Sequence, residues 1–382
     1  MAIASTLGIG SGMDIGGIVS QLVEAEGRPA FNAISRKEDS ANDRLSALGR
    51  LKSSLSDFRT ATGKLKELGV FSTHKTTSAN EDILTATATL GAAKGSYSLE
   101  VQQLAEAHKL TSSGFAARTD LVGSGTLTLD VGGSAFSVTL DATNNTLEGV
   151  RDAINKASDN SGVNASIINV DDGVGGTVSK LVLTSNDTGT ANDITVTAVE
   201  DPAVPGLSNL VYDPNGSGVA NLTEQNAAQD AKILVDGQMA TRSSNSIADV
   251  IQGVTLDLKT AEIGTVFNVD VSLDEESIKE VTEGFVGAYN NLMNVVKDLG
   301  KFDADSEDAG ALVGDSTLRS VQSQMRQAVG DSVTSATSNF NSLAMIGITI
   351  DKDGVMDLDG AEFSDALKEN LNAVSDVFAS SD

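Results

Sequence analysis

The chain has 382 residues, of which 26 are basic and 53 acidic, and its formal net charge is -27. This charge excludes the basic footprint that nucleic-acid binding needs, and it disfavours binding to an anionic membrane surface. Cysteine is absent, which excludes disulfides, cysteine-ligated zinc, iron–sulfur clusters and thiol chemistry. The length is typical of about two to three domains.

The N-terminal stretch, MAIASTLGIGSGMDIGGIV, lacks both the basic segment and the apolar core of a Sec signal peptide. We therefore expect no cleaved signal, and since no run approaches 18 apolar residues we expect no membrane-spanning helix. Aromatic residues make up 4% of the chain, whereas glycine occurs 37 times. This composition predicts aliphatic cores and many short strands joined by turns.

Apolar residues recur at helical spacing from Met13 onward, and Pro29 is expected to break or restart this first helix. Its apolar face has no local cover. Either the face packs against another part of the fold, or the segment orders only on assembly with another chain. The candidate assembly-interface residues are Ile15, Ile18, Val19 and Leu22.

Two longer apolar stripes with spacings of three and four predict helices that pack on each other in the manner of a coiled coil. The first lies in residues 45–68 and the second in residues 276–299, so the partners are far apart in sequence. The first stripe comprises Leu48, Leu51, Leu55, Phe58, Thr62 and Leu65. The second comprises Ile278, Val281, Phe285, Ala288, Leu292, Val295 and Leu299.

Between the stripes the period changes to two, which predicts strands. A hairpin is expected over residues 125–140 around Gly132-Gly133, a short helix capped by Thr146 or Asn145 follows, and residues 201–227 are expected to be a long loop. The other expected strands are 76–91, 96–102, 163–170, 178–184, 193–199, 231–235, 254–258 and 265–273.

After the second stripe, which begins at the expected N-cap Asp274, a helix is predicted over 317–329 and a hairpin over 346–358. Asp359 and Glu362 resemble a capping box that opens a last helix.

The predicted fold is α+β: a discontinuous, coiled-coil-like helical leg formed by both ends of the chain, with two inserted antiparallel β-rich head domains. Residues 1–42 form a terminal segment, helical or disordered in the monomer. The leg comprises 43–69 and 275–382, the first head 70–118 and 228–274, and the second, strongly acidic head 119–227, which we expect at the tip.

No catalytic constellation is found, so we expect no enzyme, no cofactor and no metal site. The tripeptide at Gly314-Asp315-Ser316 matches an esterase signature, but only His74 and His108 could serve as a base, and a helix N-cap explains it better. The acidic run from Asp351 to Glu362 matches an EF-hand at positions 1, 3, 7, 9 and 12, but position 5 is Val355 and position 6, where glycine is required, is Met356.

Five motifs resemble the bacterial flagellar filament cap family, also called hook-associated protein 2. They are GIGSGMDIGGIVSQLVEAEGRPAFNAI (8–34), GSYSLEVQQLAEAHKL (95–110), LVDGQMATRSSNSIADVIQGVTLDLK (234–259), FVGAYNNLMNVV (285–296) and LAMIGITIDKDGVMDLD (343–359). Residues 146–170 and 181–196 resemble a β-rich domain shared by flagellar axial proteins.

The resemblance implies a structural cap at the distal end of the filament that promotes insertion and folding of flagellin. It implies an extracellular position at the flagellum tip, reached by flagellar type III export without a cleaved signal. Expected partners are flagellin, other copies in a ring, the hook-associated junction proteins, and the export apparatus with its chaperone. Adhesion to a host surface or mucin is a further expectation.

Two alternatives stay open: a junction-type axial protein of the same helix–β–helix plan, and a surface adhesin. The family normally continues into a further long C-terminal helix, so the resemblance also implies that this segment is missing from the sequence.

Overall fold

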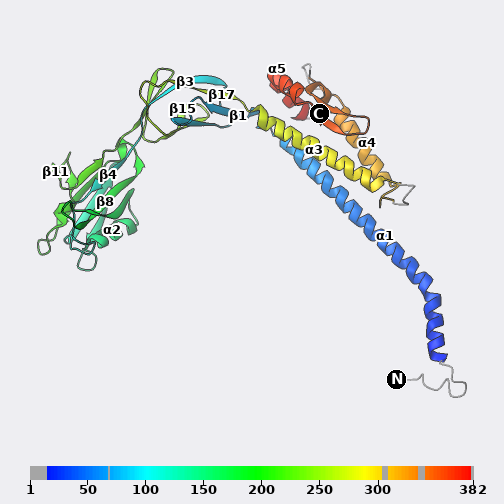
Figure 1. Cartoon of the computed structure of the whole chain (residues 1–382), viewed down its shortest axis with the longest axis horizontal. Coiled ribbons are helices and arrows are strands. Elements are labelled where there is room, and N and C mark those ends of the chain that lie inside the picture. The colour runs from blue at the N-terminus through cyan, green and yellow to red at the C-terminus, as the bar shows by residue number, and fades with distance from the viewer. Residues whose placement is uncertain (1–14, 68, 303–308, 334–339, 380–382) are drawn as a thin grey trace. The chain divides into compact units, whose positions relative to one another are not determined.

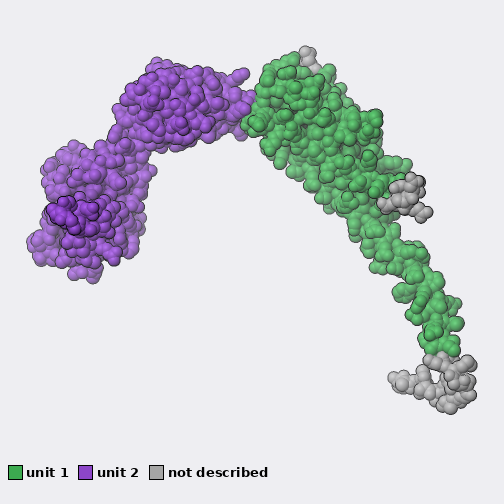
Figure 2. Space-filling view, in the orientation of Figure 1, with its two compact units in different colours: residues 1–73, 274–382 green, residues 74–273 purple. Residues whose placement is uncertain are grey.

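The computed structural model describes residues 15–67, 69–302, 309–333 and 340–379 and confirms the α+β class. Both ends of the chain, residues 1–73 and 274–382, belong to one helical unit, and residues 74–273 form a second, β-rich unit (Figure 1, Figure 2). The helical unit is therefore discontinuous in sequence, as the paired stripes predict.

The helical unit is built on one very long helix, α1, with α3 packed along it (Figure 1). The predicted interruption at Pro29 is wrong, because α1 continues through this residue. A helix exposed on all sides can lose one backbone hydrogen bond to a proline and leave the freed carbonyl to water. The elements are α1 Ile15–Lys66, η1 Val70–Ser72, α3 Glu275–Gly300, α4 Ser316–Gly330, η4 Leu343–Ile346, β18 Ile348–Ile350, β19 Met356–Leu358 and α5 Gly360–Ala379.

Helix ends in this unit follow the capping residues of the sequence. Asp274 accepts a hydrogen bond from the Ser277 backbone N–H, so it is the N-cap of α3 as expected. Asp359 accepts from the backbone N–H groups of Ala361 and Glu362 at the start of α5. Side-chain acceptors at these positions satisfy the first free N–H groups of each helix.

The seam between α1 and α3 has a strict heptad spacing, but it is offset from the predicted stripes. On α3 the buried positions are Ile278, Thr282, Phe285, Tyr289, Leu292, Val296 and Leu299. On α1 the inward positions, buried or half-buried, are Ala47, Leu51, Ser54, Phe58, Ala61 and Leu65. Every second predicted residue therefore lies in the seam, and its neighbour in the stripe flanks it.

The largest departure is Leu48, which is 40% exposed, while Ala47 beside it is buried. Leu55, Val281 and Val295 are half-buried at the edge of the seam. Small residues in the seam allow close approach of the helices, and the hydroxyls of Ser54 and Thr282 bond to helix carbonyls of Leu51 and Ile278. Ranked by hydrophobicity alone, the flanking leucines and valines would be assigned to the seam.

The β-rich unit contains two hydrophobic cores, and every strand pair in it is antiparallel. The first core lies between a five-stranded sheet, order β1-β17-β3-β13-β14, and a three-stranded sheet, order β15-β16-β2. These strands are β1 His74–Ser78, β2 Leu84–Ala88, β3 Gly95–Gln103, β13 Ala231–Val235, β14 Gln238–Arg242, β15 Ser246–Ile251, β16 Val254–Leu258 and β17 Phe267–Leu273.

The second core lies between a five-stranded sheet, order β11-β10-β9-β5-β6, and a four-stranded sheet, order β12-β4-β8-β7, with α2 packed on β7. Of the two expected N-cap residues of α2, Thr146 is the one that caps the helix. The elements are β4 Ala107–Thr111, β5 Gly125–Val131, β6 Ser134–Leu140, α2 Leu147–Lys156, β7 Val163–Asp171, β8 Thr177–Thr188, η2 Thr190–Asn192, β9 Ile194–Glu200, η3 Leu207–Leu210, β10 Tyr212–Asp213, β11 Val219–Ala220 and β12 Thr223–Asn226.

The boundary between the two cores differs from the expected residue 118/119. Strand β4 pairs with β8 and β12, and Leu110 belongs to the second core, whereas Ala105 belongs to the first. The chain therefore enters the second core near residue 106. Residues 201–227, expected to be a loop, contain three short strands and a 3-10 turn that complete its sheets.

Candidate assembly surfaces

An aromatic cluster joins the C-terminal part of α1 to the first half of α3. The ring of Phe285 lies 5.5 Å from Phe58 and 6.1 Å from Phe378 in α5, and Phe378 stacks 5.8 Å from Phe71 in η1. Aromatic pairs in this range stabilise a core beyond the area that they bury. The cluster thereby fixes α5 and η1 to the two long helices.

Tyr289 is fully buried in this cluster, 6.1 Å from Phe58, and its hydroxyl has no hydrogen-bond partner within the described part of the chain. Burial raises the pKa of the Tyr289 hydroxyl above its ordinary value. A buried polar group without a partner loses its hydration and gains nothing in return. The unpaired hydroxyl therefore lowers the stability of the folded helical unit.

We expect Tyr289→Phe to raise the free energy of unfolding by about 1 kcal/mol at neutral pH, since it removes the unpaired hydroxyl. The folded pKa lies above the unfolded one, so stability falls as the pH rises above about 10 and the unfolded chain ionises. The advantage of Tyr289→Phe should therefore widen at alkaline pH. Urea unfolding at pH 7 and 10.5 measures both effects.

The matched control is Tyr97→Phe, which removes a half-buried hydroxyl in the β-rich unit. It should not reproduce the gain. A loss of stability in Tyr289→Phe would mean that the hydroxyl has a partner in solution.

The N-terminal half of α1 carries an apolar face that no described residue covers. Ile18 is 50%, Val19 55% and Leu22 66% exposed, while the side chain of Ile15 lies outside the described residues. The same helix exposes further large apolar side chains, which the predicted set omitted: Val23, Phe31, Ile34 and Leu45. Exposed apolar residues in such number are typical of surfaces that another chain covers.

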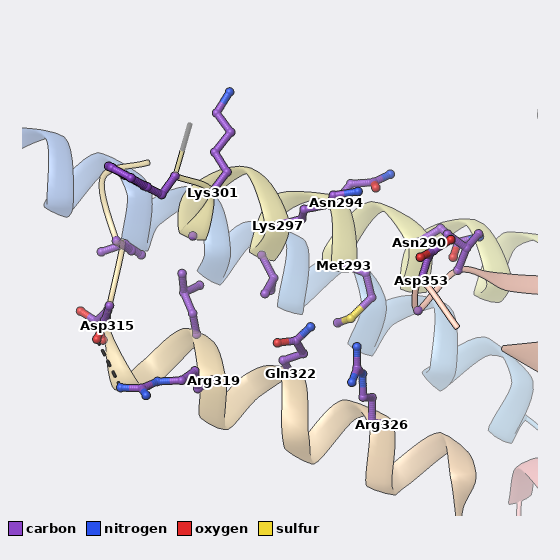
Figure 3. A pocket seen from close by; sticks show the side chains of 18 of the residues that line it. Asn290, Met293, Asn294, Lys297, Lys301, Asp315, Arg319, Gln322, Arg326 and Asp353 are labelled. Carbon is purple, nitrogen blue, oxygen red and sulfur yellow. Dashed lines mark hydrogen bonds between the residues drawn. The ribbon is translucent and has the colours of Figure 1, made fainter. Parts of the chain in front are cut away.

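A second surface is a groove of about 1010 Å³ between α3, α4 and the turn of the β18–β19 hairpin (Figure 3). Its lining includes five basic side chains, Lys297, Lys301, Arg319, Arg326 and Lys352, and two acidic ones, Asp315 and Asp353. Figure 3 shows Gln322 and Arg326 directed from α4 toward α3. The groove unites three segments that are separate in sequence, so no local motif indicates it.

The esterase-like tripeptide is a helix cap. Asp315 accepts a hydrogen bond from the Thr317 backbone N–H and lies 3.0 Å from the Arg44 guanidinium. These contacts, the bond from Thr317 first, hold the pKa of the Asp315 carboxyl below its ordinary value. The Asp315 carboxylate is therefore committed to starting α4 and to tying α4 to α1.

The EF-hand-like run is a hairpin. Asp351 accepts hydrogen bonds from the backbone N–H groups of Asp353 and Val355 in the β18–β19 turn. Among the described residues no three histidine, aspartate or glutamate side chains cluster as a metal site would require. No helix in the described part of the chain is long and apolar enough to cross a membrane.

His108 is buried against the second β core. Its Nδ1 accepts a hydrogen bond from the Ile194 backbone N–H at 2.7 Å, and its Nε2 lies 3.2 Å from the Glu224 carboxylate without a hydrogen bond to any described residue. The ring also packs 5.7 Å from Tyr212. The hydrogen bond to Ile194 ties β4 to β9, which is a structural role.

Family models match most of the chain. The N-terminal model of flagellar hook-associated protein 2 matches residues 11–108, the C-terminal model of the same protein matches 228–382, and the flagellin hook IN motif matches 126–187. The last match lies within the second β core, the part predicted to be shared with other axial proteins.

Individual relatives agree with these models. The chain is 34% identical to the B-type flagellar hook-associated protein 2 of Pseudomonas aeruginosa and 36% identical to flagellar hook-associated protein 2 of Escherichia coli K12. Each match covers 98% of this chain and 80% of the relative. The crystal structure of the D1-D2-D3 domains of the flagellar cap protein FliD from Escherichia coli matches with a TM-score of 0.73 at 34% identity, over 87% of this chain and 89% of that one.

Proposed function

The chain belongs to the flagellar hook-associated protein 2 family and is a cap of the flagellar filament tip, and from this premise we propose that it works by steric and mechanical means. Copies of the chain associate through their helical units, and flagellin subunits are inserted and fold beneath them. No covalent chemistry by the protein is needed. The observation that carries this proposal is the uncovered apolar face of α1, at Ile18, Val19 and Leu22.

Association is favoured because exposure of the apolar face of α1 to water is unfavourable. Burying an apolar side chain of this size contributes about 1.5–3 kcal/mol, so a partner that covers several of them is held firmly. The partner is another helical axial subunit, either a copy of this chain or flagellin. The export apparatus and its chaperone, the junction proteins and a host surface are further proposed partners, supported by the family resemblance alone.

We expect the triple variant Ile18→Ser, Val19→Ser, Leu22→Ser to abolish filament growth in a strain whose own cap protein is deleted, with flagellin lost to the medium. The face is exposed, so the rest of the chain should keep its helical circular dichroism. Filament length by electron microscopy and secreted flagellin measure the effect.

The control is Ser20→Ala with Glu24→Ala, two exposed residues that lie outside the apolar stripe of the same helix. This variant should support normal filaments. Filaments of normal length with the triple variant would disprove the role assigned to the face.

A further inference from the structure

Copies of a chain with a net charge of -27 repel one another, so association between them needs a local region of opposite sign. The groove between α3, α4 and the β18–β19 turn is such a region, with five basic and two acidic side chains in its lining. Both acids are already engaged: Asp315 with Arg44 and Asp353 with Lys352, at 3.0 and 3.3 Å.

Two of the cations are uncommitted. Lys297 and Arg326 are exposed, and neither forms an ion pair with any described residue. Arg319, also exposed, has one long contact, 3.4 Å to the Gly314 carbonyl. On α4, Arg319 and Arg326 are seven residues apart, so they lie on one helical face about 10.5 Å from each other.

The first half of α3 presents the complementary surface. Glu276, Glu280 and Glu283 are exposed on one face of the helix, and Glu276 and Glu280 have no ion pair with any residue that the structure describes. Glu276 and Glu283 are also seven residues apart, about 10.5 Å. Glu283 pairs with Lys279 at 3.7 Å, so Glu276 and Glu280 are the carboxylates of this face that have no ion pair among the described residues.

The acidic face continues into two glycines that no other described element approaches. Gly284 and Gly287 are exposed, and no heavy atom lies within 4 Å of the place where a Cβ would stand. Glycine in the middle of a helix is destabilising, because it adds freedom to the unfolded chain. Because glycine has no side chain, these two positions let a second helix approach this face closely.

We propose that the basic groove of one copy receives the acidic, glycine-bearing face of α3, residues 276–287, of a second copy. One copy cannot fill its own groove in this way, because the groove is lined by the other half of the same helix, from Asn290 onward. Since the two surfaces differ, the contact is heterologous, and repetition of it generates a ring when the rotation closes. The inference rests on the proposed self-association and assigns it a site.

The test is a charge swap in the full chain. One variant carries Arg319→Glu and Arg326→Glu, and the other Glu276→Arg and Glu280→Arg; all four side chains are exposed, so both variants should fold. We expect each variant alone to associate about tenfold more weakly than the wild type in sedimentation velocity. An equimolar mixture should recover the wild-type association, because each reversed surface then meets its complement.

Lys75→Glu with Lys94→Glu is the control, since it changes the net charge equally at exposed sites in the β-rich unit. It should associate within about twofold of the wild type. A second test is Gly284→Leu with Gly287→Leu: better helix formers should keep or raise the melting temperature, while the added side chains block the approach and association is lost.

The inference is overturned if either charge variant associates like the wild type, if the mixture does not recover, or if the leucine variant associates normally. A wild-type chain that caps filaments but stays monomeric at every concentration also overturns it. If the groove variant associates normally but fails to support filaments, the groove binds another protein, such as flagellin. Filament growth by the wild type reports separately on the proposed function.

Discussion

Phe285→Ala is expected to lower the free energy of unfolding of the helical unit by about 3–5 kcal/mol. The phenyl ring is 5% exposed and contacts Phe58 and Phe378, so its removal leaves a cavity between three elements. The helices supply most of the circular dichroism at 222 nm. Urea unfolding followed at this wavelength should therefore show an earlier transition.

Val281→Ala is the matched control, one turn away on the same helix. Val281 is half-buried beside the seam, so its truncation should cost about 1 kcal/mol or less. Equal losses at the two positions would mean that the seam has the spacing predicted from hydrophobicity rather than the one in the structure.

Gly125→Ala is expected to destabilise the second β core by about 3 kcal/mol or more, the sum of backbone strain and a steric clash. Gly125 has a φ of +138°, and a Cβ there would meet the Val199 carbonyl oxygen and the Glu200 backbone. These atoms belong to the neighbouring strand β9, which pairs with β5, so neither strand can yield without loss of pairing. Hydrogen exchange across β5 and β9 should speed up markedly.

Gly133→Ala separates strain from clash. Gly133 also has a positive φ, +85°, but a Cβ there would meet no atom within 4 Å. Its cost should stay near about 1 kcal/mol. A similar loss for Gly125→Ala would show that the strands around Gly125 relax easily.

Features with a strong local signal could be predicted from the sequence. The hairpin at Gly132-Gly133 and the caps at Thr146 and Asp274 follow from single residues with clear backbone preferences, and the structure contains all three. The pairing of two distant helices also followed, because each stripe needs a partner to cover it.

Features for which neighbouring residues have similar hydrophobicity or strand propensity could not be predicted as well. The helix seam buries Ala47 and Ser54, whereas the larger Leu48 is 40% exposed and Leu55 is half-buried, so hydrophobicity alone selects the wrong positions. The strands β14 and β15 were missed because their alternation of buried and exposed residues is weak.

The apolar face of α1 could be predicted from the sequence, whereas the basic groove could not. The apolar residues Ile18, Val19 and Leu22 are neighbours on one helix, so periodicity alone indicates their common face. The groove combines residues from α3, α4 and the turn near Lys352, and its charge is visible only once the chain is folded. Nothing in the sequence places Arg326 and Lys297 at the same opening.

The insertion of the β-rich unit between α1 and α3 has a consequence for the entropic cost of folding. About 200 residues separate the two helices, and closing a flexible loop of that length costs roughly 5 kcal/mol of chain entropy. In the folded protein β1 and β17 pair from His74 to Leu273, and the Asp274 N–H bonds to the Thr73 carbonyl. Because this pairing already joins the two ends of the β-rich unit, the cost of closing the loop falls on the folding of that unit and not on the contact between α1 and α3.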